Sequence, residues 1–364
     1  MIFHDRLTRL RARMRDTGTD LVAVGPTSNM VWLSGLAPHG DERPVMQIVT
    51  QGFAGFLMPA LNADSQRPAT DLPFFCWTDD VGPVQALADL LAAALPAGTP
   101  CTVALDETMR ADFALLLLDA LPVARRGFLG DTVGWLRSRK DAAEYDLLKM
   151  NAVLNDSAMR AGFAALRDGI TESEVAAAIA AVYTAHGARA EFLSVCFGGN
   201  GAFPHHATGD TRLAPGMAVL IDIGGRKQGY PSDMTRVGHF GPAPEGFAEV
   251  HAIVNRAVAA AVAAARPGVA ARTVDAAARD VITAAGYGDR FLHRTGHGLG
   301  IDIHEAPYIT ATADTVLEEG MVFSIEPGIY LTGRFGLRLE EIVILRADHA
   351  EILSDLPRDA FAQG

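Results

Sequence analysis

The chain has 364 residues, more than the roughly 100–200 of an ordinary single domain, so we expect two domains, and a hydrophobic fraction of 49% is ample for a buried core. The formal net charge of −12 argues against general binding to nucleic acid or to an anionic membrane, because either would repel an acidic surface. The three cysteines are widely spaced, the start lacks a long apolar run, and no later run approaches the ~20 apolar residues that span a bilayer, so we expect a soluble, untargeted, cytoplasmic protein.

The first third of the chain has the pattern of a small α/β domain. Apolar residues recur at helical spacing within residues 5–16, and the run 20–24 predicts a strand that enters a Gly/Pro turn. Further strand-like runs alternate with helical stretches: strands at 46–50, 53–58 and 102–105, and helices near 83–95 and 111–121. A long helical pattern then opens after residue 137. We therefore predict an N-terminal domain of residues 1–136 and a second domain of residues 137–364.

The second domain contains two similar halves. Residues 166–170 (LRDGI) precede an Ala-rich helix that ends at Gly187, and residues 265–269 (ARPGV) precede one that ends at Gly286. Ala-rich helices can resemble one another by chance. The match of residues 215–222 (PGMAVLID) with residues 319–326 (EGMVFSIE) is harder to dismiss. The repeat predicts two units, each with helices followed by a hairpin.

An acidic residue ends the apolar strand of the first half, where the pattern predicts another apolar side chain. This residue is Asp222, and Asp233 follows it downstream. The two are centred within the turn-rich segment 224–229, and antiparallel pairing about that centre would place their carboxylates side by side.

The second half repeats this arrangement. Glu326 and Glu340 are centred on Gly333, so the same pairing is expected, with an approximate register because Pro327 interrupts the ladder. Four carboxylates gathered in an apolar sheet would repel one another unless they were protonated or bridged by cations. A divalent metal is the simplest resolution, and two metals suit four acids better than one.

The expected ligands also indicate a metal and a reaction. His297 supplies a single imidazole, flanked by glycines that allow close approach of the backbone. An oxygen-dominated site with one imidazole favours Mn²⁺, with Co²⁺ or Zn²⁺ as alternatives, and the absence of cysteine ligands argues against a structural zinc. Two metals ~3.5–4 Å apart could share a bridging water, lower its pKa and polarise a carbonyl. That chemistry is hydrolysis.

Further histidines accompany these residues. The alternating run after His297 predicts a strand with Asp302 and His304 on one face, and His205 and His206 lie on an expected loop. Taken singly, such histidines are more often surface or hydrogen-bonding residues than catalysts. Together with the acids they indicate a site.

These residues resemble the creatinase/aminopeptidase P/prolidase family of pita-bread (M24-type) metallopeptidases, and the resemblance covers nearly the whole chain. It implies an α/β creatinase-like N-terminal domain and an α+β pita-bread catalytic domain with an internal pseudo-twofold repeat. The motifs occur in the family's order: 220–225 (LIDIGG), 232–236 (SDMTR), 296–305 (GHGLGIDIHE), 324–328 (SIEPG) and 336–341 (GLRLEE).

The resemblance implies a set of metal ligands. Asp233 and Glu340 would bridge two metals, Asp222 would chelate one of them, and His297 and Glu326 would complete the other. Glu326 would also accept the proton of the bridging water and pass it to the leaving amine.

The resemblance also implies residues that contact the substrate. His205 and His304 match positions that contact the scissile peptide and steady its tetrahedral intermediate, and His293 matches a histidine of the proline pocket. Arg338, two residues before Glu340, is expected to contact the ligand carboxylates, with a solvent-facing sheet charge as the alternative.

The implied reaction is hydrolysis of the Xaa-Pro bond, in dipeptides (prolidase) or in longer peptides (aminopeptidase P); a metal-free binding module is a weaker alternative. The stretch 304–307 (HEAP) looks more prolidase-like. Some prolidases, however, carry an arginine that helps hold the dipeptide carboxylate where this chain has Tyr308. The arginine that binds the carboxylate could instead be Arg338, or Arg43 reaching the site of a neighbouring subunit, if the protein forms a homodimer as its relatives do. Arg43 could equally be an exposed loop arginine without this role.

Overall fold

The computed structural model describes residues 2–364 and divides into two compact units, one extending to Arg137 and the other covering Ser138–Gly364. The first unit is α/β. The second is α+β and is built from two similar halves, so the predicted fold class is confirmed.

The N-terminal unit is a six-stranded sheet with helices packed on it. The strand order is β4-β3-β2-β1-β5-β6, in which β2 runs antiparallel to both neighbours and the remaining pairs are parallel. The strands are β1 (Leu21–Val24), β2 (Met46–Val49), β3 (Ala54–Pro59), β4 (Phe74–Trp77), β5 (Cys101–Leu105) and β6 (Val123–Phe128). The helices are α1 (Ile2–Thr17), α2 (Ser28–Ser34), α3 (Ala60–Gln66), α4 (Val84–Ala94), α5 (Ala111–Asp119) and α6 (Val133–Arg137), with 3₁₀ turns η1 (Arg67–Ala69) and η2 (Leu129–Asp131).

The sequence did not indicate β4 and β6, the two edge strands. Edge strands are covered less completely than central ones, so the apolar pattern that identifies a buried strand is weak in them. Strand β6 carries the exposed residues Arg125 and Arg126, and β4 exposes Cys76 in an otherwise apolar run.

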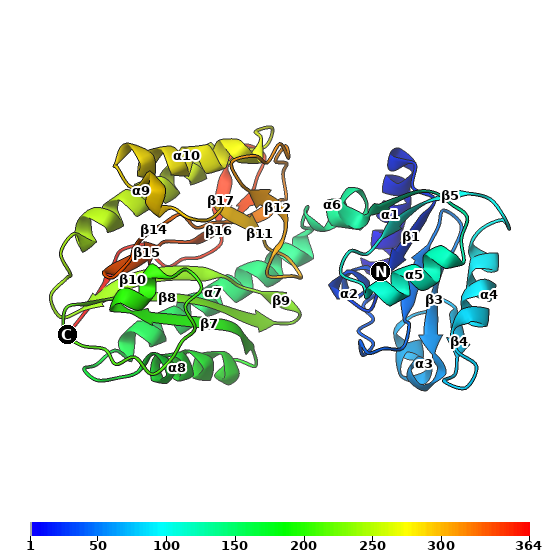
Figure 1. The fold of residues 1–364 in the computed structure, drawn as a ribbon, viewed down its shortest axis with the longest axis horizontal. Helices are drawn as coiled ribbons and strands as arrows, with labels where there is room; N and C mark the ends of the chain where they lie inside the picture. The colour runs from blue at the N-terminus through cyan, green and yellow to red at the C-terminus, as the bar shows by residue number, and fades with distance from the viewer. Residues whose placement is uncertain (1) are drawn as a thin grey trace. The chain divides into compact units, whose positions relative to one another are not determined.

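The first half of the second unit packs two helices against a sheet that is antiparallel except for β18, which runs parallel to its neighbour β10 (Figure 1). Helix α7 (Ala142–Ala164) begins at a capping box of Asp141 and Glu144, and α8 (Glu172–Ala185) begins at one of Thr171 and Glu174, which satisfies backbone N–H groups at both helix starts. The sheet order is β18-β10-β8-β7, with β9 also paired to β8; the strands are β7 (Arg189–Phe197), β8 (Met217–Lys227), β9 (Tyr230–Pro231), β10 (Met234–Phe240) and β18 (Phe361–Gln363).

Alternation along β8 determines where its acid points. Val219, Ile221 and Ile223 pack with α7 and α8, whereas Leu220 packs in the core of the other half. Asp222 has the same parity as Leu220, so it faces away from α7 and α8 and toward the second half.

The second half repeats the plan with α9 (Phe247–Ala264) and α10 (Ala271–Ala284) over a sheet of order β12-β11-β13-β16-β17 (Figure 1). Helix α9 alone is long and apolar enough to span a membrane by length and composition, among the residues described, and its apolar side chains pack in the core of this half. The strands are β11 (Gly296–Gly298), β12 (Glu305–Ile309), β13 (Val322–Ile325), β16 (Glu341–Leu345) and β17 (Ala350–Ile352). A separate hairpin of β14 (Gly328–Leu331) and β15 (Phe335–Arg338) connects β13 to β16 along the chain. The 3₁₀ turn η4 (Gly288–Arg290) belongs to this half, and η3 (Gly198–Ala202) follows β7 in the first half.

Backbone contacts confirm the predicted repeat. Gly169 and Gly268, the matched glycines before α8 and α10, both have positive φ, at 75° and 90°. Their N–H groups donate to the carbonyl oxygens of Leu213 and Leu317, each at 2.8 Å. The two halves therefore share details of chain geometry that alanine content alone would not produce.

The two predicted hairpin registers had different outcomes. Around Gly333 the expected pairing is found, since Gly328 pairs with Arg338 and Ile325 with Glu341, on either side of Glu326 and Glu340. Around residues 224–229 the predicted register was wrong, because the residue opposite Asp222 is two positions after the expected Asp233.

Asp222 faces Thr235 across the ladder, and Asp233 lies in the break between β9 and β10. The chain reverses in a tight turn at Gln228 (φ 53°) and Gly229 (φ 84°), at the end of the turn-rich segment 224–229. Two successive residues with positive φ are the signature of a two-residue hairpin turn. A second prediction was also wrong: residues 301–304, including Asp302 and His304, form a bent loop and not a strand.

Candidate metal centre

Five side chains from both halves of the second unit converge on one cavity. Strand β8 supplies Asp222 and the segment before β10 supplies Asp233, while β11 supplies His297. Glu326 follows β13 and Glu340 precedes β16. The cavity has a volume of ≈ 590 Å³, and its other lining residues are Phe192, Pro204, His205, His293, Arg294, Ile303, His304 and Arg338.

Ligand atoms of these five residues form two overlapping groups. One oxygen each from Asp222, Asp233 and Glu340 lie within 4.8 Å of one another. Atoms of His297, Glu326 and Glu340 form a second group within the same limit, and Glu340 belongs to both. This spacing suits two cations that share a carboxylate.

The ring of His297 is oriented for coordination. Its Nδ1 lies 3.1 Å from the carbonyl oxygen of Gly298, which can only accept, so Nδ1 carries the proton. The lone pair of Nε2 is left facing the acids, at 3.2 Å from Glu326 Oε1 and 3.6 Å from Asp233 Oδ2. The hydroxyl of Ser324 links the two residues, because it accepts from His297 N at 2.9 Å and donates to Glu326 Oε1 at 3.1 Å.

A buried arginine holds the other side of the cluster. Arg338, 4% exposed, donates to Asp222 Oδ2 at 2.6 Å, to Thr235 Oγ1 at 3.0 Å and to Tyr330 Oη at 2.8 Å. Thr235 in turn donates to Glu340 Oε2 at 2.9 Å. Arg338 therefore fixes two of the acids, one directly and one through a hydroxyl.

The chain of contacts continues from Tyr330 to His293. The Tyr330 hydroxyl lies 2.7 Å from His293 Nε2, and His293 Nδ1 donates to the carbonyl oxygen of Arg294 at 2.7 Å. Burial lowers the pKa of His293, which favours the neutral ring, and Nε2 then accepts a hydrogen bond from the Tyr330 hydroxyl.

With all four acids ionised, this cluster would carry more negative charge than Arg338 and the neighbouring donors neutralise. Burial raises the pKa of Asp222, and burial together with the neighbouring carboxylates raises the pKa of Asp233 and of Glu340 well above the ordinary range. In addition, Asp222 Oδ1 is buried and has no hydrogen-bond partner in the protein. A buried acceptor without a donor is costly, and a cation would satisfy it, so these residues fit divalent metals.

Two histidines line the cavity beside the acids. His304 packs its ring on that of His297, with centroids 3.9 Å apart, and burial, followed by the charges of His297 and Arg294, lowers its pKa to about 4. His205 is exposed on the segment after η3. Its neighbour His206 instead lies 3.0 Å from the buried carboxylate of Glu172, which anchors the segment that carries His205.

The remaining predicted residues are not among those that line the cavity. Arg43 belongs to the N-terminal unit, where its guanidinium pairs with Asp79 at 2.9 Å and with Asp41 at 3.2 Å. Asp302 lies outside the lining of the cavity.

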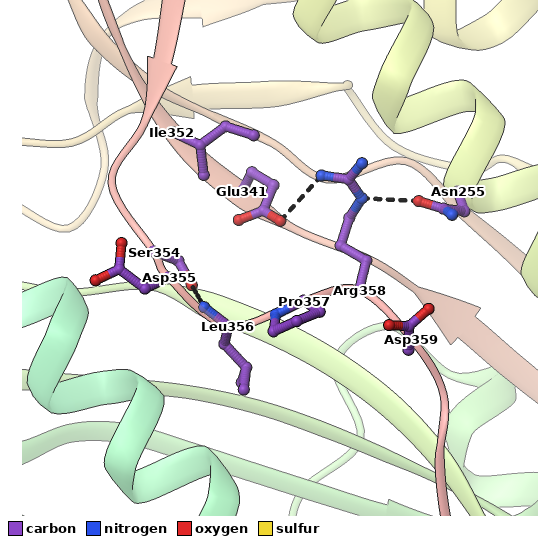
Figure 2. Close-up of a pocket in the computed structure, with 9 residues that line it drawn as sticks. All are labelled: Asn255, Glu341, Ile352, Ser354, Asp355, Leu356, Pro357, Arg358 and Asp359. Carbon is purple, nitrogen blue, oxygen red and sulfur yellow. Dashed lines mark hydrogen bonds and ion pairs between the residues drawn. The ribbon is translucent and has the colours of Figure 1, made fainter.

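Sequence reasoning missed a second cavity, of ≈ 400 Å³, behind strand β16 (Figure 2). Figure 2 shows the Arg358 guanidinium between Glu341, at 3.1 Å, and Asn255, at 2.7 Å. Arg236, fully buried, also donates to Glu341 at 3.0 Å and to the carbonyl oxygens of Glu340 and Leu356. Arg236 and Glu341 lie in the motif segments 232–236 and 336–341, so the motifs could have directed attention to these two residues. These contacts bind the backbone of Glu340 to the C-terminal segment.

Comparison with known proteins places the chain in a family. The model of metallopeptidase family M24 matches residues 146–347, and that of the creatinase/prolidase N-terminal domain matches residues 6–138. The probable dipeptidase PepE of Mycobacterium tuberculosis is 37% identical over 98% of this chain and 96% of its own length. The Xaa-Pro dipeptidase of Lactobacillus helveticus is 30% identical over 97% of each. The crystal structure of dipeptidase PepE from Mycobacterium ulcerans superposes with a TM-score of 0.93 at 36% identity, covering 99% of this chain and 98% of that one. The chain therefore belongs to metallopeptidase family M24, the family that its motifs resemble, and carries a creatinase/prolidase N-terminal domain.

Proposed function

We propose that this enzyme is a prolidase, which hydrolyses the Xaa-Pro bond of dipeptides with two divalent metals. The observation that carries the proposal is the convergence of four carboxylates and His297 in one cavity whose negative charge the protein leaves partly uncompensated. Membership of the M24 family implies divalent metals. The names of the two relatives, a probable dipeptidase and an Xaa-Pro dipeptidase, support the substrate class.

The assignment of Glu340, Asp222, His297 and Glu326 follows the grouping of the side chains, whereas Asp233 is assigned as a second shared ligand because its Oδ2 also lies 3.6 Å from His297 Nε2 and because the family resemblance implies that role. We assign Asp233 and Glu340 as the shared ligands, Asp222 to one ion, and His297 with Glu326 to the other. Oxygen ligands with one imidazole favour Mn²⁺, with Co²⁺ or Zn²⁺ as alternatives. When bound, the ions would lower the pKa of the attacking water and polarise the scissile carbonyl.

The protein's own groups would move the protons. Ser324 donates to Glu326 Oε1, and Glu326 Oε2, which lies 4.0 Å from Arg338 Nε, would take a proton from the attacking water. The same carboxylic acid would then return that proton to the proline nitrogen as the C–N bond breaks. His205 and His304, which line the cavity, would donate hydrogen bonds to the peptide oxygen as negative charge develops on it.

The lining of the cavity suits a proline ring. Proline has no N–H, so its cleavage calls for a site built around the ring in place of extended backbone pairing. Phe192, Pro204 and Ile303 supply an apolar part of the lining, and the neutral His293 lies beside them in the same cavity.

Rates on three substrates test the proposal. We expect kcat/KM to be highest for Ala-Pro, lower for Ala-Pro-Ala and negligible for Ala-Ala. Preference for the tripeptide would identify an aminopeptidase P. Brisk cleavage of Ala-Ala would exclude proline specificity. A protein purified without chelator that contains no metal, and that binds Xaa-Pro peptides without cleaving them even after Mn²⁺ or Co²⁺ is added, would indicate a binding module.

We also propose that residues 1–136 and 137–364 act as the N-terminal and catalytic domains of a cytoplasmic homodimer. The three cysteines, all of them free thiols in the described chain, suit a reducing compartment. Light scattering on the purified protein tests the dimer.

A further inference from the structure

Two arginines line the cavity, and they differ in what binds them. Arg338 is buried and engaged by Asp222, Thr235 and Tyr330. Arg294 is half-buried, and among the described residues its guanidinium forms no ion pair with a carboxylate. A guanidinium beside four carboxylates that nevertheless pairs with none of them is available to a ligand.

An aromatic platform fixes the position of Arg294. Its guanidinium carbon lies 4.8 Å from the ring centroid of Tyr308, a distance typical of a cation over an aromatic face. Tyr308 is 43% exposed and pairs with His297 across the β11–β12 ladder, so both side chains project from the same face of that hairpin. The cation is therefore held beside the proposed metal site without being neutralised.

Stacking leaves the N–H groups at the edge of the guanidinium free. A planar guanidinium of this kind binds a carboxylate through two parallel hydrogen bonds, and an arginine held by an aromatic ring loses less conformational freedom on binding than a free one. The ligand that fits such a group in a cavity of ≈ 590 Å³ is a small molecule with a free carboxylate.

We infer that Arg294 binds the C-terminal carboxylate of the substrate and so makes the enzyme select dipeptides over longer or capped peptides. This inference rests on the proposed prolidase function and deepens it. It also replaces the two arginines expected for this role from the sequence, since Arg338 is held by Asp222 and Arg43 by acids of the N-terminal unit.

A neutral analogue of the substrate separates recognition of the carboxylate from every other effect. Ala-Pro and Ala-Pro amide contain the same scissile bond, and only the first carries a terminal charge. In the wild type we expect Ala-Pro to be preferred. Arg294→Met should lower kcat/KM for Ala-Pro by about ten- to a hundredfold, mainly through KM, and leave the amide unchanged, because one charge-assisted pair accounts for that range.

Three further variants make the test specific. Arg294→Lys keeps the charge without the planar fork and should retain part of the preference for the acid. Tyr308→Ala should weaken the preference by removing the platform, whereas Tyr308→Phe should preserve it. Arg290→Met changes an exposed arginine outside the cavity lining and should behave as wild type.

The outcomes distinguish the two proposals. If the wild type cleaves neither compound, the prolidase function itself fails. If the wild type cleaves both and Arg294→Met lowers both equally, or alters neither, Arg294 does not bind the carboxylate. Metal content, measured on every variant, separates loss of recognition from loss of the metal ions.

Discussion

Arg338 Nη2 lies 2.6 Å from Asp222 Oδ2, and among the residues described Arg338 is the only arginine or lysine that forms an ion pair within 4.0 Å with a carboxylate of the cluster. The pair is buried, and its geometry is completed by Thr235 and Tyr330. Removing one partner of such a pair leaves an uncompensated charge in the interior.

Arg338→Met should therefore destabilise the catalytic domain. We expect the free energy of unfolding to fall by ~3 kcal/mol, as for other broken buried pairs. Denaturant unfolding of the chelator-treated protein measures the change. Arg110→Met, which removes an exposed pair with Asp112, serves as the control and should leave unfolding unaltered. Wild-type stability in Arg338→Met would show that Asp222 is not ionised in the metal-free protein.

Removal of metal should abolish activity. We expect two divalent ions per chain, loss of activity in chelator, recovery best with Mn²⁺ or Co²⁺, and a higher melting temperature on reloading, because ions that bind the folded state stabilise it. Elemental analysis alongside rate measurements on Ala-Pro checks this. Full activity in a verified metal-free preparation would refute the metal assignment.

Substitution of a shared ligand should be more damaging than substitution of a substrate-contacting histidine. Asp233→Asn or Glu340→Gln should abolish hydrolysis and reduce the metal content, since each residue is assigned to both ions. His205→Ala should keep its metal and lose mainly kcat. Asp348→Asn, at an exposed acid, is the matched control. The opposite pattern of metal loss would mean that these roles are assigned wrongly.

Gly296→Ala should disrupt the strand that carries His297. A Cβ at this position would meet the backbone carbonyl of Ser324 in the neighbouring strand, and neither strand can move without shifting the metal ligands. We expect both metal content and activity to fall. Gly199→Ala, whose Cβ would enter open space, should retain both. Equal metal content in the two variants would show that the backbone of Ser324 does not lie close enough to Gly296 to exclude a Cβ.

The sequence allowed the elements with strong periodicity to be predicted, together with the acids that interrupt it. The register around Gly333 followed from symmetry alone and was correct. The register at Asp222 depended on where the chain turns, and several glycines in segment 224–229 offered competing turns. Gln228, a non-glycine residue with positive φ, carries no sequence signal for the turn it makes.

The sequence also could not show which arginine pairs with which distant acid. Nothing in the local pattern separates Arg338, which is buried against Asp222, from Arg294, which is left without an acid. The difference depends on which strands are neighbours in space, and a guanidinium has the same local sequence preferences whether or not an acid lies opposite it.

The contacts of Arg236 determine the stage of synthesis at which the structure around the metal ligands can be completed. Its guanidinium binds the carbonyl oxygens of Leu356 and Pro357, and strand β10 pairs with β18 at residues 361–363. A ribosome releases these residues after every metal ligand has already emerged. The nascent chain thus exposes all five ligands while the sheet behind Asp222 still lacks strand β18 and Arg236 still lacks two of its acceptors, the carbonyl oxygens of Leu356 and Pro357. The full set of contacts behind the site can form only after the C-terminal segment has emerged.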